Sequence, residues 1–195
     1  MKKLVCLAFI AIMSTVKLCA QERDSGEIEL IPYMGYTGSF LNGDHLNELL
    51  EPKSSFRFGA NVDYYLNDRW SLRSGLNYDT QGVESNGRKL NLNYITAPLN
   101  INWHFGSTRK WNLNFGFSAG ILASAKYDGV KINDGIKSFQ LAISSGIGYK
   151  FEVSRNFNLM LDIQNQFGIT NYLESDMLKR TNVASSFNIG GVFLL

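Results

Sequence analysis

The sequence predicts an all-β protein, an eight-stranded antiparallel up-and-down transmembrane β-barrel with short periplasmic turns and four longer extracellular loops. Three observations predict this fold. Apolar and polar residues alternate with a period of two over eight segments, short and long connections alternate between these segments, and aromatic residues gather at both segment ends. The charged share is 18%, below the roughly 25% of soluble domains. After the N-terminus, no apolar run approaches the roughly 20 residues of a spanning helix.

The first 20 residues predict a cleaved signal peptide. Lys2 and Lys3 precede an apolar stretch at 4–13, and the small residue Ala20 closes the segment. We expect cleavage after Ala20, which leaves residues 21–195 as the outer-membrane barrel domain.

Loss of this leader changes the chemistry that the chain can offer. The leader carries three lysines and no acid, so the formal net charge of +2 becomes −1, and nucleic acid is not an expected partner. Cys6 and Cys19 also leave, which excludes disulfides and thiolate metal sites from the mature chain. A lipoprotein signal that acylates Cys19 is the alternative, although Lys17 and Leu18 stand where it requires small or apolar residues.

The first four strands are expected at about 27–37, 56–66, 70–80 and 95–105. The first is the least regular, because Pro32 interrupts it and its facing is ambiguous. The second and third alternate well. The fourth places Ile101 and Trp103 on one face and Asn100 and Asn102 on the other.

The last four strands are expected at about 111–121, 139–151, 157–169 and 187–195. The seventh alternates most cleanly, and Asn165 is the one polar residue on its apolar face. A strand of about 11 residues, at about 3.3 Å per residue and a tilt near 40°, covers about 27 Å, close to the apolar band of an outer-membrane barrel.

The connections predict the orientation. Short ones are expected at 67–69, 106–110 and 152–156, and long ones at about 38–55, 81–92, 127–137 and 170–185. In outer-membrane barrels, short turns face the periplasm and long loops face outward. Both termini are therefore expected on the periplasmic side.

Aromatic residues support the same arrangement. A periplasmic aromatic girdle is expected from Trp70, Trp103, Trp111, Phe105, Phe151, Phe157 and Phe193. A second belt is expected at the long-loop ends from Phe56, Tyr78, Tyr94, Tyr127, Phe139 and Tyr172. The alternative, a soluble barrel or sandwich, would require a surface made mostly of Asn, Ser, Gly and Gln with few Lys and Glu, which is unusual.

The polar face would fill the lumen. Pairing Leu66 with Trp70 across the first short turn sets opposite-charge residues directly across the strands. The expected lumen ion pairs are Asp63 with Arg73 and Arg57 with Asp79. We interpret them as structural pairs in a filled interior, where inward glycines leave room for long side chains; a gate or a binding site is the alternative. Eight strands enclose a lumen just wide enough for its own side chains, so a diffusion pore is not expected.

No catalytic, cofactor or metal site is expected, and the chain is not predicted to be an enzyme. His45 lies in the first long loop, and His104 points inward beside a short turn. Ser107 is near His104 in sequence, but no carboxylate accompanies them, so a Ser-His-acid arrangement is incomplete. Asp128 and Gly129 indicate a turn rather than a calcium loop.

The C-terminus follows a polar-x-Gly-x-x-aromatic-x-apolar pattern, formed by Asn188, Gly190, Phe193 and Leu195. It resembles the signal by which the barrel assembly machinery engages the last strand of its clients. The usual terminal aromatic residue is replaced by Leu195.

With the leader, the eight alternating segments, the Tyr94–Leu99 segment and this C-terminal pattern, the chain resembles the PorT-like outer-membrane β-barrel family of Bacteroidota. The resemblance implies the fold and an outer-membrane location. The name-giving member is linked to the type IX secretion system. Outer-membrane lipids and the assembly machinery are the expected partners.

Three hypotheses on function follow. The first is a small structural or interaction barrel. The second is an accessory component of a secretion or assembly complex, with secretion-system proteins as partners. The third is an enzyme that modifies outer-membrane lipids. Apolar residues in the long loops, such as Leu46 and Leu49, favour interaction over catalysis.

Overall fold

The structure, a computed structural model, describes residues 23–43, 50–132, 134–154, 156–173 and 180–195. The expected signal peptide and His45 lie outside these residues. The described strands are β1 (Ile28–Gly43), β2 (Leu50–Tyr65), β3 (Trp70–Ser85), β4 (Arg88–Phe105), β5 (Trp111–Tyr127), β6 (Val130–Ile132), β7 (Phe139–Glu152), β8 (Phe157–Gly168) and β9 (Arg180–Leu194). The described residues contain no helix that is both long and apolar enough to cross a membrane.

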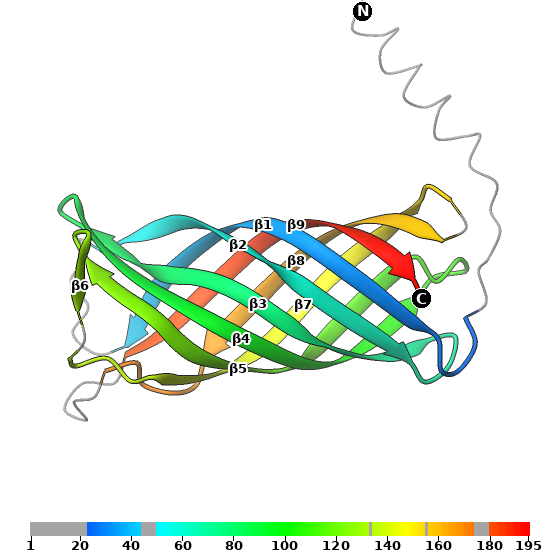
Figure 1. Ribbon diagram of the computed structural model, residues 1–195, viewed down its shortest axis with the longest axis horizontal. Coiled ribbons are helices and arrows are strands. Elements are labelled where there is room, and N and C mark those ends of the chain that lie inside the picture. The colour runs from blue at the N-terminus through cyan, green and yellow to red at the C-terminus, as the bar shows by residue number, and fades with distance from the viewer. Residues whose placement is uncertain (1–22, 44–49, 133, 155, 174–179) are drawn as a thin grey trace, which may run out of the picture.

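Eight of these strands close into an antiparallel barrel, which confirms the predicted eight-stranded antiparallel β-barrel (Figure 1). Each barrel strand pairs with its neighbours in chain order, β4 pairs with β5, and β9 pairs with β1 to complete the circle. The short β6 pairs only with β5 among the described residues, so it lies outside the barrel wall.

The strands are staggered around the barrel. When the paired residues are followed once round from Ser39, the path returns to β1 at Glu29, ten residues away. For eight strands, this stagger corresponds to a tilt of roughly 40°. The stagger places residues that are far apart in sequence at one level of the lumen.

Apolar side chains point outward and polar ones point inward. Phe58, Leu99 and Phe117 on the outer face are 56%, 58% and 57% exposed. Asn100 and Asn112 on the inner face are buried. The first strand follows the same rule less clearly, because Ile31 and Leu41 point inward, which explains its ambiguous sequence pattern.

The barrel strands contain 12 to 18 residues, so the prediction of about 11 was too short. The expected loop at 81–92 was wrong, because β3 and β4 continue pairing to a two-residue turn at Asn86 and Gly87. These residues have φ angles of +49° and +75°, the left-handed values that an Asn-Gly hairpin turn requires. A second such turn at Asp128 and Gly129 joins β5 to β6.

Two residues of the expected second aromatic belt lie inside the protein. Tyr94 is fully buried and Tyr172 is 4% exposed. A register shift between Asn93 and Tyr94 accompanies the inward turn of the latter. Both belong to an apolar cluster that we call the apolar cap, formed by Leu41, Val83, Leu92, Tyr94, Ala125, Ile136 and Tyr172. The cap fills the long-loop end of the barrel.

Candidate functional site in the filled lumen

The structure brings together both predicted ion pairs inside the barrel. Arg73 donates from Nε and Nη2 to the two carboxylate oxygens of Asp63, over 2.7 and 2.8 Å. Arg57 Nε lies 2.9 Å from Asp79 Oδ1. Each acid faces its arginine directly across β2 and β3. All four side chains are buried, so each charge has a counter-charge where water is scarce.

A third acid, Asp162 of β8, joins the Asp63–Arg73 pair, and the sequence reasoning did not single it out. Its Oδ2 lies 3.7 Å from Arg73 Nη1, and its Oδ1 accepts a 2.7 Å hydrogen bond from the amide of Asn188. The signal was present, because Asp162 falls on the polar face of its alternating segment. The pairing across the barrel is the part that only the closed fold reveals.

The Arg57–Asp79 pair is held by neutral groups from other strands. Thr96 donates to Asp79 Oδ2 over 2.6 Å, and Arg57 Nη1 donates to Ser186 Oγ over 2.9 Å. Next to this pair, amide side chains form a ladder of hydrogen bonds across the lumen. In order, the ladder runs through Gln166, Gln81, Gln140 and Asn182.

A second charged group closes the short-turn end of the lumen. Glu29 accepts hydrogen bonds from Arg23 Nε at 2.8 Å and from the Tyr65 hydroxyl at 3.1 Å, and it pairs with Lys150. Lys150 also donates to the Tyr65 hydroxyl over 2.8 Å. Burial lowers the pKa of Arg23, but its interactions with Tyr65 and Glu29 outweigh burial, so the pKa lies above its usual value. We call these four residues the basal plug.

The sequence reasoning missed the basal plug for two reasons. The residue pattern of β1 does not show which of its faces points inward, and Arg23 precedes this strand. Glu29 and Lys150 are separated by 121 positions and meet only through the stagger of the barrel. Both are about 1% exposed.

His104 lies beside the basal plug. Its ring stacks on Tyr65 with centroids 4.8 Å apart, and its Nε2 is 2.9 Å from Ser71 Oγ. Among the described residues, Nδ1 of His104 has no hydrogen-bond partner. The serine that contacts His104 is therefore Ser71. A catalytic triad would also require a carboxylate hydrogen-bonded to Nδ1, the other ring nitrogen of His104. His104 and Ser71 are both fully buried, so the arrangement offers a packed polar contact.

Glycines create the space that these side chains fill. Gly35, Gly59, Gly75 and Gly116 each face an asparagine on the neighbouring strand, and that asparagine lies over the glycine backbone. A Cβ at Gly59 would come within 2.8 Å of the Asn77 Cα, closer than real Cβ contacts allow. Glycine opposite asparagine is therefore a packing unit of this lumen.

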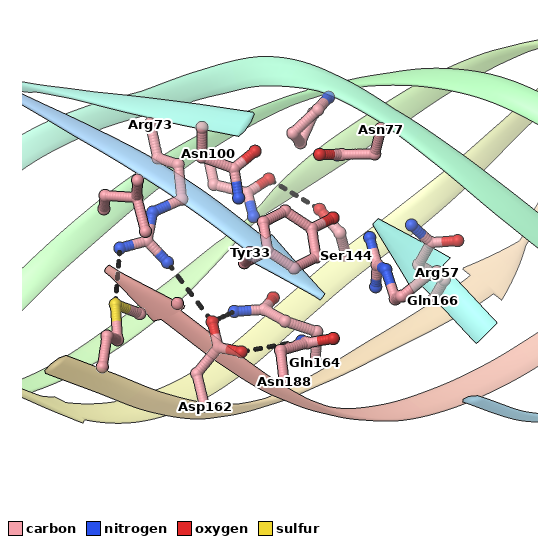
Figure 2. A pocket seen from close by; sticks show the side chains of 15 residues that line it. Tyr33, Arg57, Arg73, Asn77, Asn100, Ser144, Asp162, Gln164, Gln166 and Asn188 are labelled. Atoms are coloured by element: carbon pink, nitrogen blue, oxygen red, sulfur yellow. Dashed lines mark hydrogen bonds and ion pairs between the residues drawn. The ribbon is translucent and has the colours of Figure 1, made fainter. Parts of the chain in front are cut away.

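A small cavity lies between the two arginine layers (Figure 2). Its volume is about 30 Å³, enough for roughly two water molecules. Figure 2 shows Tyr33, Arg57, Arg73 and Asp162 around it. The hydroxyl of Tyr33 has no hydrogen-bond partner among the described protein atoms, so water is the ligand that suits it.

The seven predicted girdle residues all lie at strand ends next to the short turns. Five ring contacts link Trp70, Trp103, Phe105, Trp111, Tyr149 and Phe151, with centroids 4.7 to 6.2 Å apart. Phe157 and Phe193 contact each other at 5.0 Å. The sequence reasoning did not include Tyr149.

The residues of the expected assembly signal lie on β9 or directly after it. Asn188 and Gly190 point inward, Phe193 points outward, and Leu195 follows the last paired position. β9 closes the barrel between β8 and β1.

Comparison with known proteins agrees with this architecture. A sequence model described as outer membrane protein beta-barrel domain matches residues 19–174. The comparison with curated proteins finds no match.

Solved structures that are similar to this chain include those of OprG, AlkL and Neisserial surface protein A. Pseudomonas aeruginosa OprG has 11% identity and a TM-score of 0.52, with 88% of this chain and 97% of OprG covered. AlkL, solved in lipid bilayers, has 13% identity and a TM-score of 0.53, with 88% and 91% covered. Neisserial surface protein A has 14% identity and a TM-score of 0.53, with 85% and 96% covered. At such identities, these similarities show the fold alone.

Proposed function

Because the chain belongs to the outer membrane protein beta-barrel domain family, we propose that it is a closed outer-membrane barrel with a structural and interaction role. Its outer face contacts lipid. Rigidly packed side chains fill its lumen, so the lumen is not a channel. Partners bind at the long-loop end of the barrel.

The filling of the lumen is the observation that carries this proposal. From one end to the other, the described residues place the basal plug, the Asp63–Arg73 pair, the Arg57–Asp79 pair, the amide ladder and the apolar cap. The cavity of about 30 Å³ between the arginines is too small for solutes larger than water. Burying this many charges and hydrogen bonds favours a single stable packing over a gate.

The long-loop end supports the interaction role. Tyr127 lies six residues beyond Ile121 on β5, roughly 15 Å further along the barrel axis for a tilted strand. The part of β5 beyond Ile121 therefore extends the barrel at this end, and strand pairing and the apolar cap hold it in place. Tyr127 and Val130 at its tip are 44% and 69% exposed, which gives a rigid surface with apolar and aromatic contacts.

The expected orientation belongs to the same proposal. Short turns and both termini would face the periplasm, where residues 1–20 would have been cleaved, and the Asn188–Leu195 segment would be read by the barrel assembly machinery. The place of this segment on β9, the strand that pairs with both β8 and β1, supports that assignment.

The second hypothesis keeps the PorT-like role. In it, secretion-system proteins bind the short turns or the outer face, and the barrel is their membrane anchor. Catalysis on lipids is less well supported, because the Ser71–His104 contact is fully buried and lies at the short-turn end.

Conductance in planar bilayers tests the closed lumen. We expect insertions of the purified barrel to leave the current at the level of protein-free membranes, while a general porin in the same membranes gives stable steps. Steady steps from the wild-type protein would contradict a closed lumen.

Co-purification in mild detergent tests the partners. A reproducible set of secretion proteins that is lost when the short turns are substituted would favour the PorT-like role. Partners lost instead on Tyr127→Ala with Val130→Ser would support the interaction role of the long-loop end.

A further inference from the structure

The outer face of the barrel carries a polar cluster on β7, β8 and β9. Asn165 of β8 pairs with Ser145 of β7 on one side and with Ser185 of β9 on the other. The Ser185 hydroxyl donates a 2.7 Å hydrogen bond to Asn165 Oδ1. Ser185 is exposed on the outer face, and Ser145 and Asn165 are half-buried there. We call these three residues the lipid-face polar cluster.

The cluster lies at the depth of the hydrocarbon. Asn165 follows the girdle residue Phe157 by eight positions, roughly 20 Å along the barrel axis, within an apolar band about 25 Å tall. On the same outer face, Phe167 of β8 and Ile169, which directly follows β8, lie beyond it and are 48% and 42% exposed. Ile163 lies before it and is 47% exposed.

Hydrocarbon does not satisfy these groups. The Asn165 carboxamide has two N–H donors and an oxygen, and the described residues supply it with one hydrogen bond, from Ser185. An amide in an apolar medium without partners costs several kcal/mol, which is why polar residues facing lipid mark contacts with other membrane proteins.

We infer that this cluster is the centre of an interface with a second copy of the same chain. A carboxamide flanked by two hydroxyls is self-complementary, because its unused N–H donors match the serine and amide oxygens of a copy related by a two-fold axis. The face is also hollowed nearby. A groove of about 680 Å³, bordered by Trp111, Ile163 and Phe187, lies over β5 and β7 to β9 and gives room for a bulky apolar side chain of the second copy.

Sedimentation equilibrium in density-matched detergent tests this inference, with the matched variants Asn165→Leu and Ser74→Leu. Ser74 is an exposed outward residue of β3, away from the cluster, so it controls for a change of the lipid-contacting surface. We expect a wild-type dimer, an unchanged Ser74→Leu dimer, and a dimerisation constant weakened roughly tenfold by Asn165→Leu. Heat-modified gel mobility confirms that each variant is a folded barrel.

Cross-linking in native membranes gives an independent readout. Ser145→Cys leaves the Asn165–Ser185 hydrogen bond in place, and with a short bifunctional maleimide it should give several-fold more dimer than Ser74→Cys. A wild-type monomer at all protein-to-lipid ratios, an unweakened Asn165→Leu dimer, or equal cross-linking of the two cysteine variants would overturn the inference. Cross-linking of Ser145→Cys to a different protein alone would overturn it as well.

Discussion

Asp63 and Arg73 face each other across the β2–β3 hairpin and form a two-bonded ion pair inside the barrel, with hydrogen bonds of 2.7 and 2.8 Å. Asn102 adds a 3.1 Å hydrogen bond to the same carboxylate. The pair links three adjacent strands at one level. Since a buried charge without a partner is costly, the two residues are expected to depend on each other.

Asp63→Leu should therefore destabilise the barrel more than the loss of both charges does. We expect about 3 kcal/mol for the single substitution and a clearly smaller loss for Asp63→Leu with Arg73→Leu. Reversible urea unfolding in lipid vesicles measures both. A loss in the double variant that equals or exceeds the loss in Asp63→Leu would show that the two charges are not coupled. The nearby Asp162 would then be the counter-charge that matters to Arg73.

The glycine–asparagine packing unit predicts a sharp difference between two glycines. A Cβ at Gly75 would collide with the Ala60 carbonyl oxygen and lie 2.8 Å from the Asn61 Cα, so Gly75→Ala should cost about 2 kcal/mol. Gly38 of β1 has no atom within 4 Å of its Cβ position and no positive φ. Gly38→Ala should therefore be neutral or slightly stabilising. Equal losses in vesicle unfolding would refute the packing unit.

The barrel could be predicted from the sequence because its inner and outer faces differ along most strands. The hairpin register also placed Asp63 opposite Arg73, since that pairing depends only on one short turn. Contacts across the barrel, such as Glu29 with Lys150, depend on the stagger of all eight strands, which no local pattern contains.

The long-loop end was predicted less well, for a different reason. There the strands leave the apolar band, so inward residues no longer need to be polar and the alternation weakens. The Asn86–Gly87 signal was present in the sequence, but the apolar residues beside it, such as Leu92, obscured the continuing strands.

The inward position of Tyr94 gives a third prediction. As a fully buried member of the apolar cap, it should cost about 3 kcal/mol or more when changed to alanine, and the long-loop end should open more often. Added protease should then cut the Tyr94→Ala long-loop end faster than wild type. Tyr127→Ala, which removes an exposed ring on β5, is the matched control and should leave the rate unchanged. Similar cleavage rates for the two variants would indicate that Tyr94 belongs to an exposed aromatic belt and not to the apolar cap.

The tryptophans give the fourth prediction, on the depth of the girdle. The chain has three, Trp70, Trp103 and Trp111, and all border short turns. Trp70 and Trp103 stack with centroids 6.2 Å apart, so they share one level. At a membrane interface, their fluorescence should be quenched most by lipids brominated near the headgroup and least by lipids brominated at the chain end. The variant Trp103→Phe with Trp111→Phe should keep this depth profile at lower intensity, because the remaining Trp70 lies at the same level. Strongest quenching by the chain-end bromines would place the three rings at the bilayer centre, and no quenching at all would place them outside the membrane.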